Sequence, residues 1–234
     1  MSGYPASGQL ILDLAQPEAP TFANFVAGAN REALAALTAL AAGHSRETGI
    51  LLWGAEGAGK SHLLRASASA ASAVRPVLHC ASAHEAPDGS DLAPSTLVVV
   101  DAVDRADAAG EARLFTLINR LAASGGQWLA AASLPPARLA LREDLRTRLA
   151  LGLVLEVLPL ADADKHQALA AYARERGFRL SDDVITYLLA HGRRDMPSLV
   201  ATLAALDRHS LATQRGVTVP LLREWLQGEL GLGR

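Results

Sequence analysis

Residues 54–61 read Gly54-Ala55-Glu56-Gly57-Ala58-Gly59-Lys60-Ser61. This order of glycines, lysine and serine is the G-x-x-x-x-G-K-[ST] pattern of a phosphate-binding loop. The apolar run 50–53 before it predicts a buried strand, and the alanine-rich stretch 62–73 after it predicts a helix. A loop between a strand and a helix start gathers backbone N–H groups around one anion. The alternative, a plain glycine-rich turn, does not call for a lysine beside a serine.

The loop predicts a nucleotide site with defined roles. The glycines allow the tight backbone, Lys60 reaches the β- and γ-phosphates, and the Ser61 hydroxyl binds Mg²⁺. Lys60 and Lys165 are the only lysines in the chain, so a lysine at this position of the motif makes the match specific. We expect ADP or ATP to be held with Mg²⁺ by Gly54, Gly57, Ala58, Gly59, Lys60, Ser61 and His62.

A second group of polar residues follows two other predicted strands. Asp101 ends the apolar run 97–100, where a carboxylate lies beside the phosphate loop and acts as a second Mg²⁺ ligand. The next residue is Ala102, where many such ATPases have a second acid, and Asp104 is not expected to replace it. We therefore predict slow hydrolysis. Ser133 is either a sensor of the γ-phosphate or a turn-forming serine.

The remaining pattern predicts two folded parts. Strands at 50–53, 74–80, 97–100, 127–132 and 153–158 alternate with helices, including one predicted over 138–149. This alternation predicts an α/β fold with a parallel sheet. Beyond Pro159 only helical segments follow. The predicted domains are a flexible leader (1–20), an α/β nucleotide-binding domain (21–158) and a small all-helical lid domain (159–234).

Composition excludes several classes of protein. The 234 residues carry a net charge of −2, which does not indicate a basic nucleic-acid surface. Cys80 is the single cysteine, so the chain has no internal disulfide and a cysteine-rich metal site is not expected. The longest apolar run is too short to cross a bilayer. We expect a cytoplasmic protein that does not bind membranes.

Several arginines and the leader contain further candidate functional residues. Arg148 is a candidate arginine finger in trans, whereas Arg142 and Arg146 fit a solvated helix face better. Arg194 opens a helical segment and is either a lid contact to the nucleotide or ordinary surface. In an extended leader, Leu10, Leu12 and Leu14 share one face, which fits either a partner's hydrophobic groove or an added edge strand.

Together these motifs resemble the DnaA family of bacterial AAA+ ATPases. The likeness rests on the segment 21–26, the loop followed by Ser-His-Leu-Leu, the strand ending at Asp101, the stretch from Ser133 to Pro136, and the Arg148 and Arg194 segments. It covers residues 20–228. The sequence leaves no room for the C-terminal helix-turn-helix domain of DnaA, so sequence-specific DNA binding is not expected. The chain is most similar to the regulatory members that inactivate the initiator.

The resemblance implies a specific function. Such a regulator, bound to ADP and tethered to the β sliding clamp of DNA polymerase III, stimulates ATP hydrolysis by DnaA and so inhibits re-initiation. By position, Arg148 is the finger, Arg194 is the lid arginine, and Phe22 and Val26 flank the adenine. The clamp-binding peptide comprises Gln9, Leu10, Leu12 and Leu14. Self-association is left open.

Two other hypotheses remain. A helicase-loader-like ATPase predicts rapid intrinsic turnover and salt-sensitive DNA binding, against which Ala102 and a pI near 6.4 argue. A DnaA-like scaffold that only pairs with the initiator predicts that Lys60→Ala has no effect. The sequence also departs from the family at Ser133 and Leu134, which stand where the family has an Asp-Arg pair, and the short 81–94 segment does not favour a single-strand DNA contact.

Overall fold

The computed structural model describes residues 19–213 and 216–231. Its described residues form two compact units, 19–165 and 166–231, and each is described by itself. The division at 165/166 lies close to the domain boundary that the sequence suggests at 158/159, which remains a prediction. The candidate peptide from Gln9 to Leu14 lies outside the described residues.

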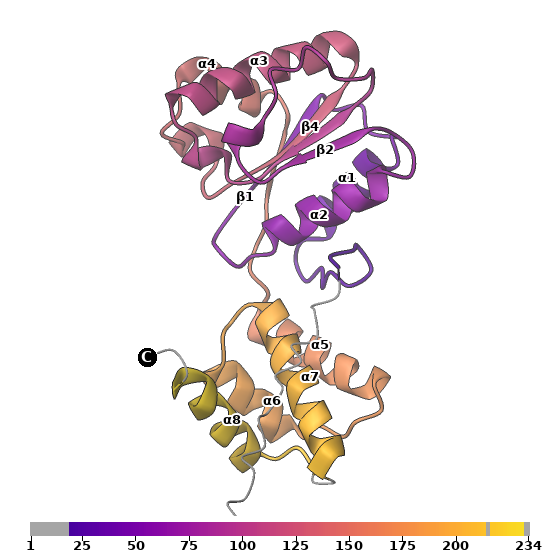
Figure 1. The fold of residues 1–234 in the computed structure, drawn as a ribbon, viewed down its shortest axis with the longest axis vertical. Helices are drawn as coiled ribbons and strands as arrows, with labels where there is room; N and C mark the ends of the chain where they lie inside the picture. The colour runs from indigo at the N-terminus through magenta and orange to yellow at the C-terminus, as the bar shows by residue number, and fades with distance from the viewer. Residues whose placement is uncertain (1–18, 214–215, 232–234) are drawn as a thin grey trace, which may run out of the picture. The chain divides into compact units, whose positions relative to one another are not determined.

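A parallel five-stranded sheet forms the centre of the first unit, as predicted (Figure 1). Its strands lie in the order β2-β3-β4-β1-β5, and every neighbouring pair is parallel. The carboxyl ends of all strands therefore meet at one edge, which is where ligands bind in open α/β sheets. The strands are β1 (Gly49–Trp53), β2 (Val77–Cys80), β3 (Leu97–Val100), β4 (Gln127–Ala132) and β5 (Leu153–Glu156).

Helices cover both faces of this sheet (Figure 1). One face packs against α1 (Arg31–Ala41) and α2 (Lys60–Ala71), and the other against α3 (Ala108–Ser124) and α4 (Glu143–Ala150). Strand side chains alternate between the two cores, so in β1 Ile50 and Leu52 join the α1/α2 side and Leu51 joins the α3/α4 side. This alternation is the period-2 geometry of strands that are buried on both faces.

The chain between β4 and β5 differs from the prediction. The predicted helix over 138–149 is instead a short 3₁₀ helix, η3 (Pro136–Arg138), an extended link, and then α4. Leu139 and Leu141 in that link are both buried in the α3/α4 core, and the backbone between η3 and α4 is not helical. The N–H of Arg142, the N-cap of α4, donates to Glu111 Oε2 at 2.7 Å. Helical propensity was therefore overridden by core packing.

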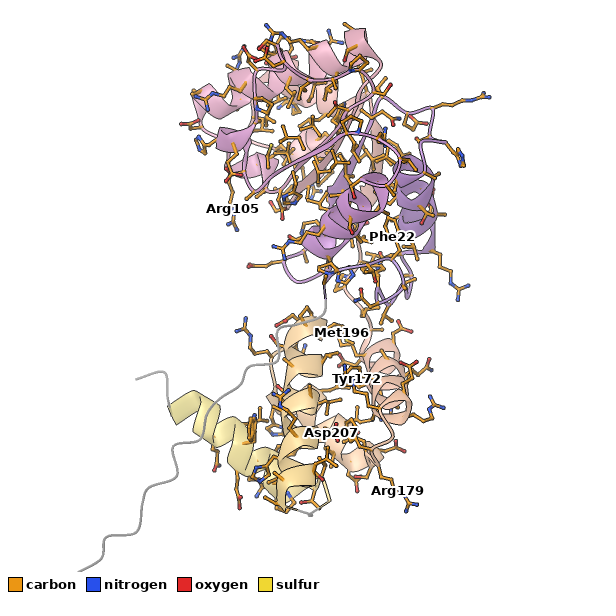
Figure 2. The ribbon with its side chains drawn as sticks, turned by 45° about the vertical axis from the view of Figure 1, so that its right-hand side comes forward. Phe22, Arg105, Tyr172, Arg179, Met196 and Asp207 are labelled. Carbon is orange, nitrogen blue, oxygen red and sulfur yellow. The ribbon has the colours of Figure 1, made fainter. Side chains whose placement is uncertain are left out.

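The second unit consists of α5, whose first residues belong to the first unit, and three further helices. They are α5 (Asp162–Glu175), α6 (Asp182–His191), α7 (Met196–Thr213) and α8 (Val219–Gly231). Leucines and β-branched residues from all four helices meet in one core, with Leu188, Leu203 and Leu206 fully buried. Figure 2 shows Met196 at the start of α7 and Asp207 further along it. Among the described helices, none has the length and hydropathy that a membrane span requires.

Candidate nucleotide site

The phosphate loop joins β1 to α2 with a backbone that requires glycine. Gly54, Gly57 and Gly59 have φ angles of +147°, +77° and +102°, which side-chain-bearing residues rarely adopt. A Cβ on Gly54 would lie 2.3 Å from the Val157 carbonyl oxygen, because Val157 N–H donates to the Trp53 carbonyl at 2.7 Å next to the loop. The first glycine is therefore fixed by close packing against the end of β5.

Lys60 stands at the N-terminus of α2 and closes the loop. Its Nζ donates to the carbonyls of Gly54 at 2.7 Å and Ala55 at 2.8 Å. Partial burial lowers the pKa of Lys60, against an opposing effect of Asp101, Asp104 and Glu56 that raises it. The ammonium thus lies inside the loop, where three acidic side chains favour its charged form.

The start of α2 offers the donors that a phosphate needs. The N-cap is Gly59, and no side chain caps this end of the helix. The first N–H groups of a helix have no partner within the helix, and they carry a partial positive charge. Gly57 and Ser61 are exposed beside them. Free amides, an ammonium and a hydroxyl on one loop fit a nucleoside diphosphate.

A turn from the N-terminal segment covers this loop, and the sequence did not indicate it. Thr21 and Asn24 exchange side-chain-to-backbone hydrogen bonds of 2.8 and 3.1 Å, which directs Phe25 onto the loop. A Cβ on Gly59 would lie 2.9 Å from Phe25 Cε2. The Phe25 and His62 rings lie 5.5 Å apart, and His62 Nε2 lies 2.9 Å from the Thr21 carbonyl oxygen. Phe25 thus lies against the phosphate loop and is a further candidate residue, which the sequence did not single out.

The two residues predicted to flank the adenine lie in the same segment. Phe22, labelled in Figure 2, and Val26 are both half-buried, and Phe22 packs against the α1/α2 core. Asn30 anchors the end of this segment. It is 4% exposed, and its side chain exchanges two hydrogen bonds with the backbone of Leu158, 2.9 Å to the carbonyl and 2.8 Å from the N–H.

Asp101 lies at the end of β3, two strands away from β1 in the sheet. Its Oδ1 accepts from the Ala102 N–H at 2.8 Å, and Ala102 itself has a φ of +47°. The second carboxylate oxygen has no hydrogen-bond partner within the described residues. Mg²⁺ in phosphate sites takes few protein ligands and several waters, so Ser61 and Asp101 are a suitable set. Among the described residues, no cluster of three or more His, Cys, Asp or Glu forms a separate metal site.

Asp104 and Ser133 contact each other, which the sequence did not predict. Asp104 Oδ2 accepts from the Ser133 N–H at 3.0 Å and also from its hydroxyl. Asp104 belongs to the 3₁₀ helix η2 (Val103–Arg105), and Ser133 follows β4 directly. Both residues therefore stand at the carboxyl edge of the sheet, beside the phosphate loop.

The candidate arginines differ in their surroundings. Arg148 is exposed in the last turn of α4 and makes no ion pair within the described part of the chain. Arg142 pairs with Asp144 at 2.6 Å, and Arg146 is half-buried. Arg194 is exposed in the second unit, one residue before Asp195, which accepts from the Ser198 N–H at 2.9 Å near the start of α7. Of the α4 arginines, Arg148 alone is exposed without an ion-pair partner within the described chain.

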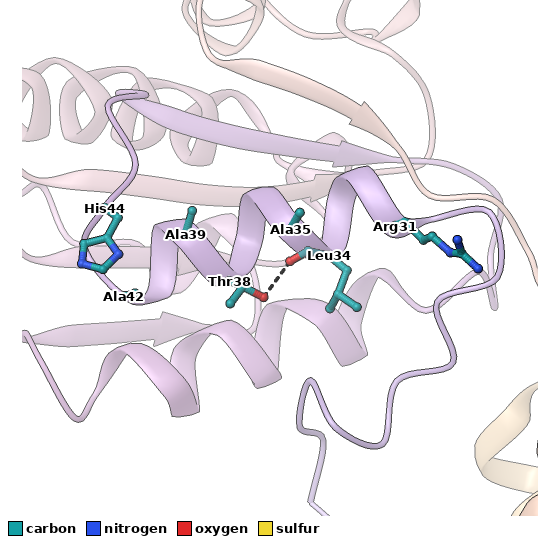
Figure 3. Close-up of a pocket in the computed structure, with 7 residues that line it drawn as sticks. All are labelled: Arg31, Leu34, Ala35, Thr38, Ala39, Ala42 and His44. Atoms are coloured by element: carbon teal, nitrogen blue, oxygen red, sulfur yellow. Dashed lines mark hydrogen bonds between the residues drawn. The ribbon is translucent and has the colours of Figure 1, made fainter.

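A shallow cavity of about 490 Å³ on the outer side of α1 presents fewer polar and charged groups than the phosphate loop (Figure 3). Its floor is made of Leu34 and small residues, and the Thr38 hydroxyl donates back to the Leu34 carbonyl of the same helix. Arg31 and His44 are its only charged or titratable residues. Ligand sites need converging polar groups, and those converge at the phosphate loop instead.

Comparisons with known protein families agree with this arrangement. A family model described as the bacterial DnaA ATPase domain matches residues 17–82, and one described as the lid domain of Hda matches residues 162–226. The chain is an Hda-like, DnaA-related AAA+ protein. The first match includes the phosphate loop and the turn above it, and the second spans almost all of the helical unit.

Solved structures show the same AAA+ fold. Domain III of the Thermotoga maritima replication initiation protein DnaA is similar with a TM-score of 0.73 at 19% identity, over 90% of this chain and 97% of that one. AMPPCP-bound DnaA from Aquifex aeolicus gives 0.66 at 20% identity, over 81% of this chain and 65% of that one. The T. maritima Holliday junction branch migration motor RuvB gives a TM-score of 0.62 at 17% identity, over 84% of this chain and 67% of that one. At these identities the likeness concerns the fold alone.

Proposed function

We propose that this protein is a negative regulator of replication initiation. In this proposal it binds ADP, docks on the β sliding clamp and stimulates ATP hydrolysis by DnaA, with Arg148 as the arginine finger. The observation that carries the proposal is Arg148 at the end of α4 in a DnaA-related AAA+ unit, exposed and without an ion-pair partner among the described residues. An arginine finger supplied in trans stabilises the charge on a partner's transferred phosphoryl group, so its guanidinium must be accessible to that partner.

The arrangement of layers supports action on a partner rather than on the chain's own nucleotide. Arg148 belongs to α4, whereas the phosphate loop leads into α2 on the opposite face of the sheet (Figure 1). Leu145 and Leu149 bury the inner side of α4, which fixes the helix and leaves Arg148 on its outer side. A guanidinium held in this way is suited to stabilise charge on a neighbouring molecule's γ-phosphate.

The nucleotide serves a structural role in this proposal. The phosphate loop supplies Lys60 and the α2 amides for the diphosphate, while Ser61 and Asp101 hold Mg²⁺. Ala102 offers no carboxylate to activate water, so weak intrinsic hydrolysis is expected. Arg194 contacts the nucleotide from the lid. Gln9, Leu10, Leu12 and Leu14, outside the described residues, bind the clamp.

The deciding experiment replaces Arg148 by alanine. The variant is expected to bind ADP and clamp as the wild type does and to lose stimulation of DnaA hydrolysis by at least about 100-fold, since arginine fingers contribute 10³–10⁵ in rate. Phosphate release from ATP–DnaA, in the presence of clamp-loaded DNA, measures this. Arg146→Ala is the matched control, because it removes the same charge from the same helix. Undiminished stimulation by the Arg148 variant would refute the finger assignment.

The clamp contact is tested separately. The double variant Gln9→Ala, Leu10→Ala is expected to lose clamp affinity in a pull-down while its ADP affinity stays unchanged. A replacement of Glu18 by alanine controls for a general effect of altering the leader. Clamp binding that persists in the double variant would remove the leader from the proposed interface.

A further inference from the structure

Asp104 and Ser133 lie beside the phosphate loop at the carboxyl edge of the sheet. In the parallel register Trp53 of β1 is opposite Ala132 of β4, so Gly54 and Ser133 are the first residues after the ends of two neighbouring strands. Lys60 Nζ bonds to the carbonyl of that same Gly54 at 2.7 Å. Asp104 contributes to the electrostatic field at Lys60, which agrees with this placement.

Both hydrogen-bond donors of Ser133 are engaged in the contact with Asp104. A serine hydroxyl has one proton to donate, and here the hydroxyl and the backbone N–H of Ser133 both donate to Asp104 Oδ2. Neither donor is then free for a phosphate oxygen. An ionised carboxylate can only accept, so Asp104 presents no donor of its own.

The backbone holds Asp104 in this place. Ala102 turns the chain in the left-handed region, with a φ of +47°, immediately after β3. Val103 is 1% exposed in the α3/α4 core, and Arg105 N–H closes the 3₁₀ turn on the Ala102 carbonyl at 3.0 Å. The half-buried carboxylate is therefore set by a packed turn.

We propose that Asp104 is a specificity-determining residue that makes this site favour a nucleoside diphosphate over the corresponding triphosphate. It withdraws Ser133 from the γ-phosphate and adds negative charge beside the position that this phosphate would take. Two like charges a few ångströms apart near a protein surface repel strongly. The inference rests on the proposed nucleotide site and names the residue that selects its ligand.

The test compares Asp104→Asn with the wild type by calorimetry, using Mg²⁺ with ADP and with the ATP analogue AMPPCP. Asparagine keeps an oxygen that accepts from Ser133, loses the charge, and gains an N–H₂ donor. The ratio of AMPPCP to ADP affinity is expected to rise about tenfold, with ADP affinity changed by less than about twofold. Asp107→Asn is the matched control: it removes an equal charge three residues away, where the carboxylate accepts from Gly110 N–H at 2.8 Å.

A second variant keeps the proposal testable if Asp104→Asn does not fold. Ser133→Ala removes the hydroxyl and is expected to change AMPPCP affinity by less than about twofold, because that hydroxyl already donates its hydrogen bond to Asp104. A tenfold loss of AMPPCP affinity would show that Ser133 donates to the γ-phosphate, which overturns the inference. An affinity ratio unmoved by Asp104→Asn overturns it as well. If the wild type binds neither nucleotide, the proposed function itself fails and this inference falls with it.

Discussion

The two edges of the central sheet both carry charged and amide side chains, but they use them differently. At the amino edge, Arg75 donates to the Leu40 carbonyl and to Gln127 Oε1, and Gln127 Nε2 donates to the carbonyls of Ser45 and Glu47. These bonds join segments up to 82 residues apart. At the carboxyl edge, the hydrogen bonds that Lys60 makes within the described part of the chain are to carbonyls of its own loop, five and six residues away.

The difference separates a structural edge from a ligand edge. At the amino edge, side chains satisfy carbonyls at the C-terminus of α1 and before β1, so polar groups there stabilise the fold. At the carboxyl edge, the α2 amides have no side-chain cap, and the phosphate loop beside them contains three glycines with positive φ, Gly54, Gly57 and Gly59. Free donors at a helix start mark a ligand site, because they have no partner within the helix. Variants at the two edges should therefore separate stability from binding.

The largest effect is expected from Gly54→Ala, at the ligand edge. The new Cβ would collide with the Val157 carbonyl, and alanine would also have to adopt a φ of +147°. We expect a loss of about 4 kcal/mol in the free energy of unfolding, measured by urea denaturation. Gly57→Ala is the control, since a Cβ there meets nothing within 4 Å and the cost is about 1 kcal/mol of backbone strain. Equal losses in both variants would contradict the packing argument.

Lys60→Ala should next change binding with little change in stability. Removing the ammonium should weaken ADP binding about 100-fold, or about 2.7 kcal/mol, as calorimetry would show. Stability should change by less than about 1 kcal/mol, since solvent can replace the lysine at these partly exposed carbonyls. Arg65→Ala, which removes a charge from an exposed position one turn along α2, should leave ADP affinity unchanged. A Lys60 variant that binds ADP normally would favour the scaffold hypothesis.

Arg75→Ala should give the opposite result, with a smaller magnitude. Losing its charge-assisted hydrogen bonds to Leu40 and Gln127 should cost about 2 kcal/mol of unfolding free energy. Partial burial lowers the pKa of Arg75, which still remains cationic at neutral pH. ADP affinity should be unaffected because the residue lies at the far edge of the sheet. The exposed Arg46→Ala is the control, and a weakened ADP affinity in the Arg75 variant alone would contradict the division between the edges.

Local patterns predicted most of the fold but not the contacts between distant segments. The buried strands, the alanine-rich helices and the phosphate loop were evident because each is encoded in consecutive residues, and the AAA+ architecture is confirmed. The Asp104–Ser133 contact spans 29 residues and depends on Ala102 adopting a left-handed turn, which alanine does not signal. Phe25 was missed because its place over Gly59 depends on the Thr21–Asn24 turn. The break before α4 was missed because buried leucines suit a helix and an extended link alike.

The paired hydrogen bonds between Asn30 and Leu158 join positions 128 residues apart. So long a separation delays their formation during folding, because loop-closure entropy must first be overcome. In the native protein, the Leu158 amide can exchange its hydrogen with deuterated solvent only when the Asn30 side chain withdraws. Its exchange rate therefore reports how often the Asn30 contact opens at the end of the segment that carries Phe22 and Phe25, without any label attached to the chain.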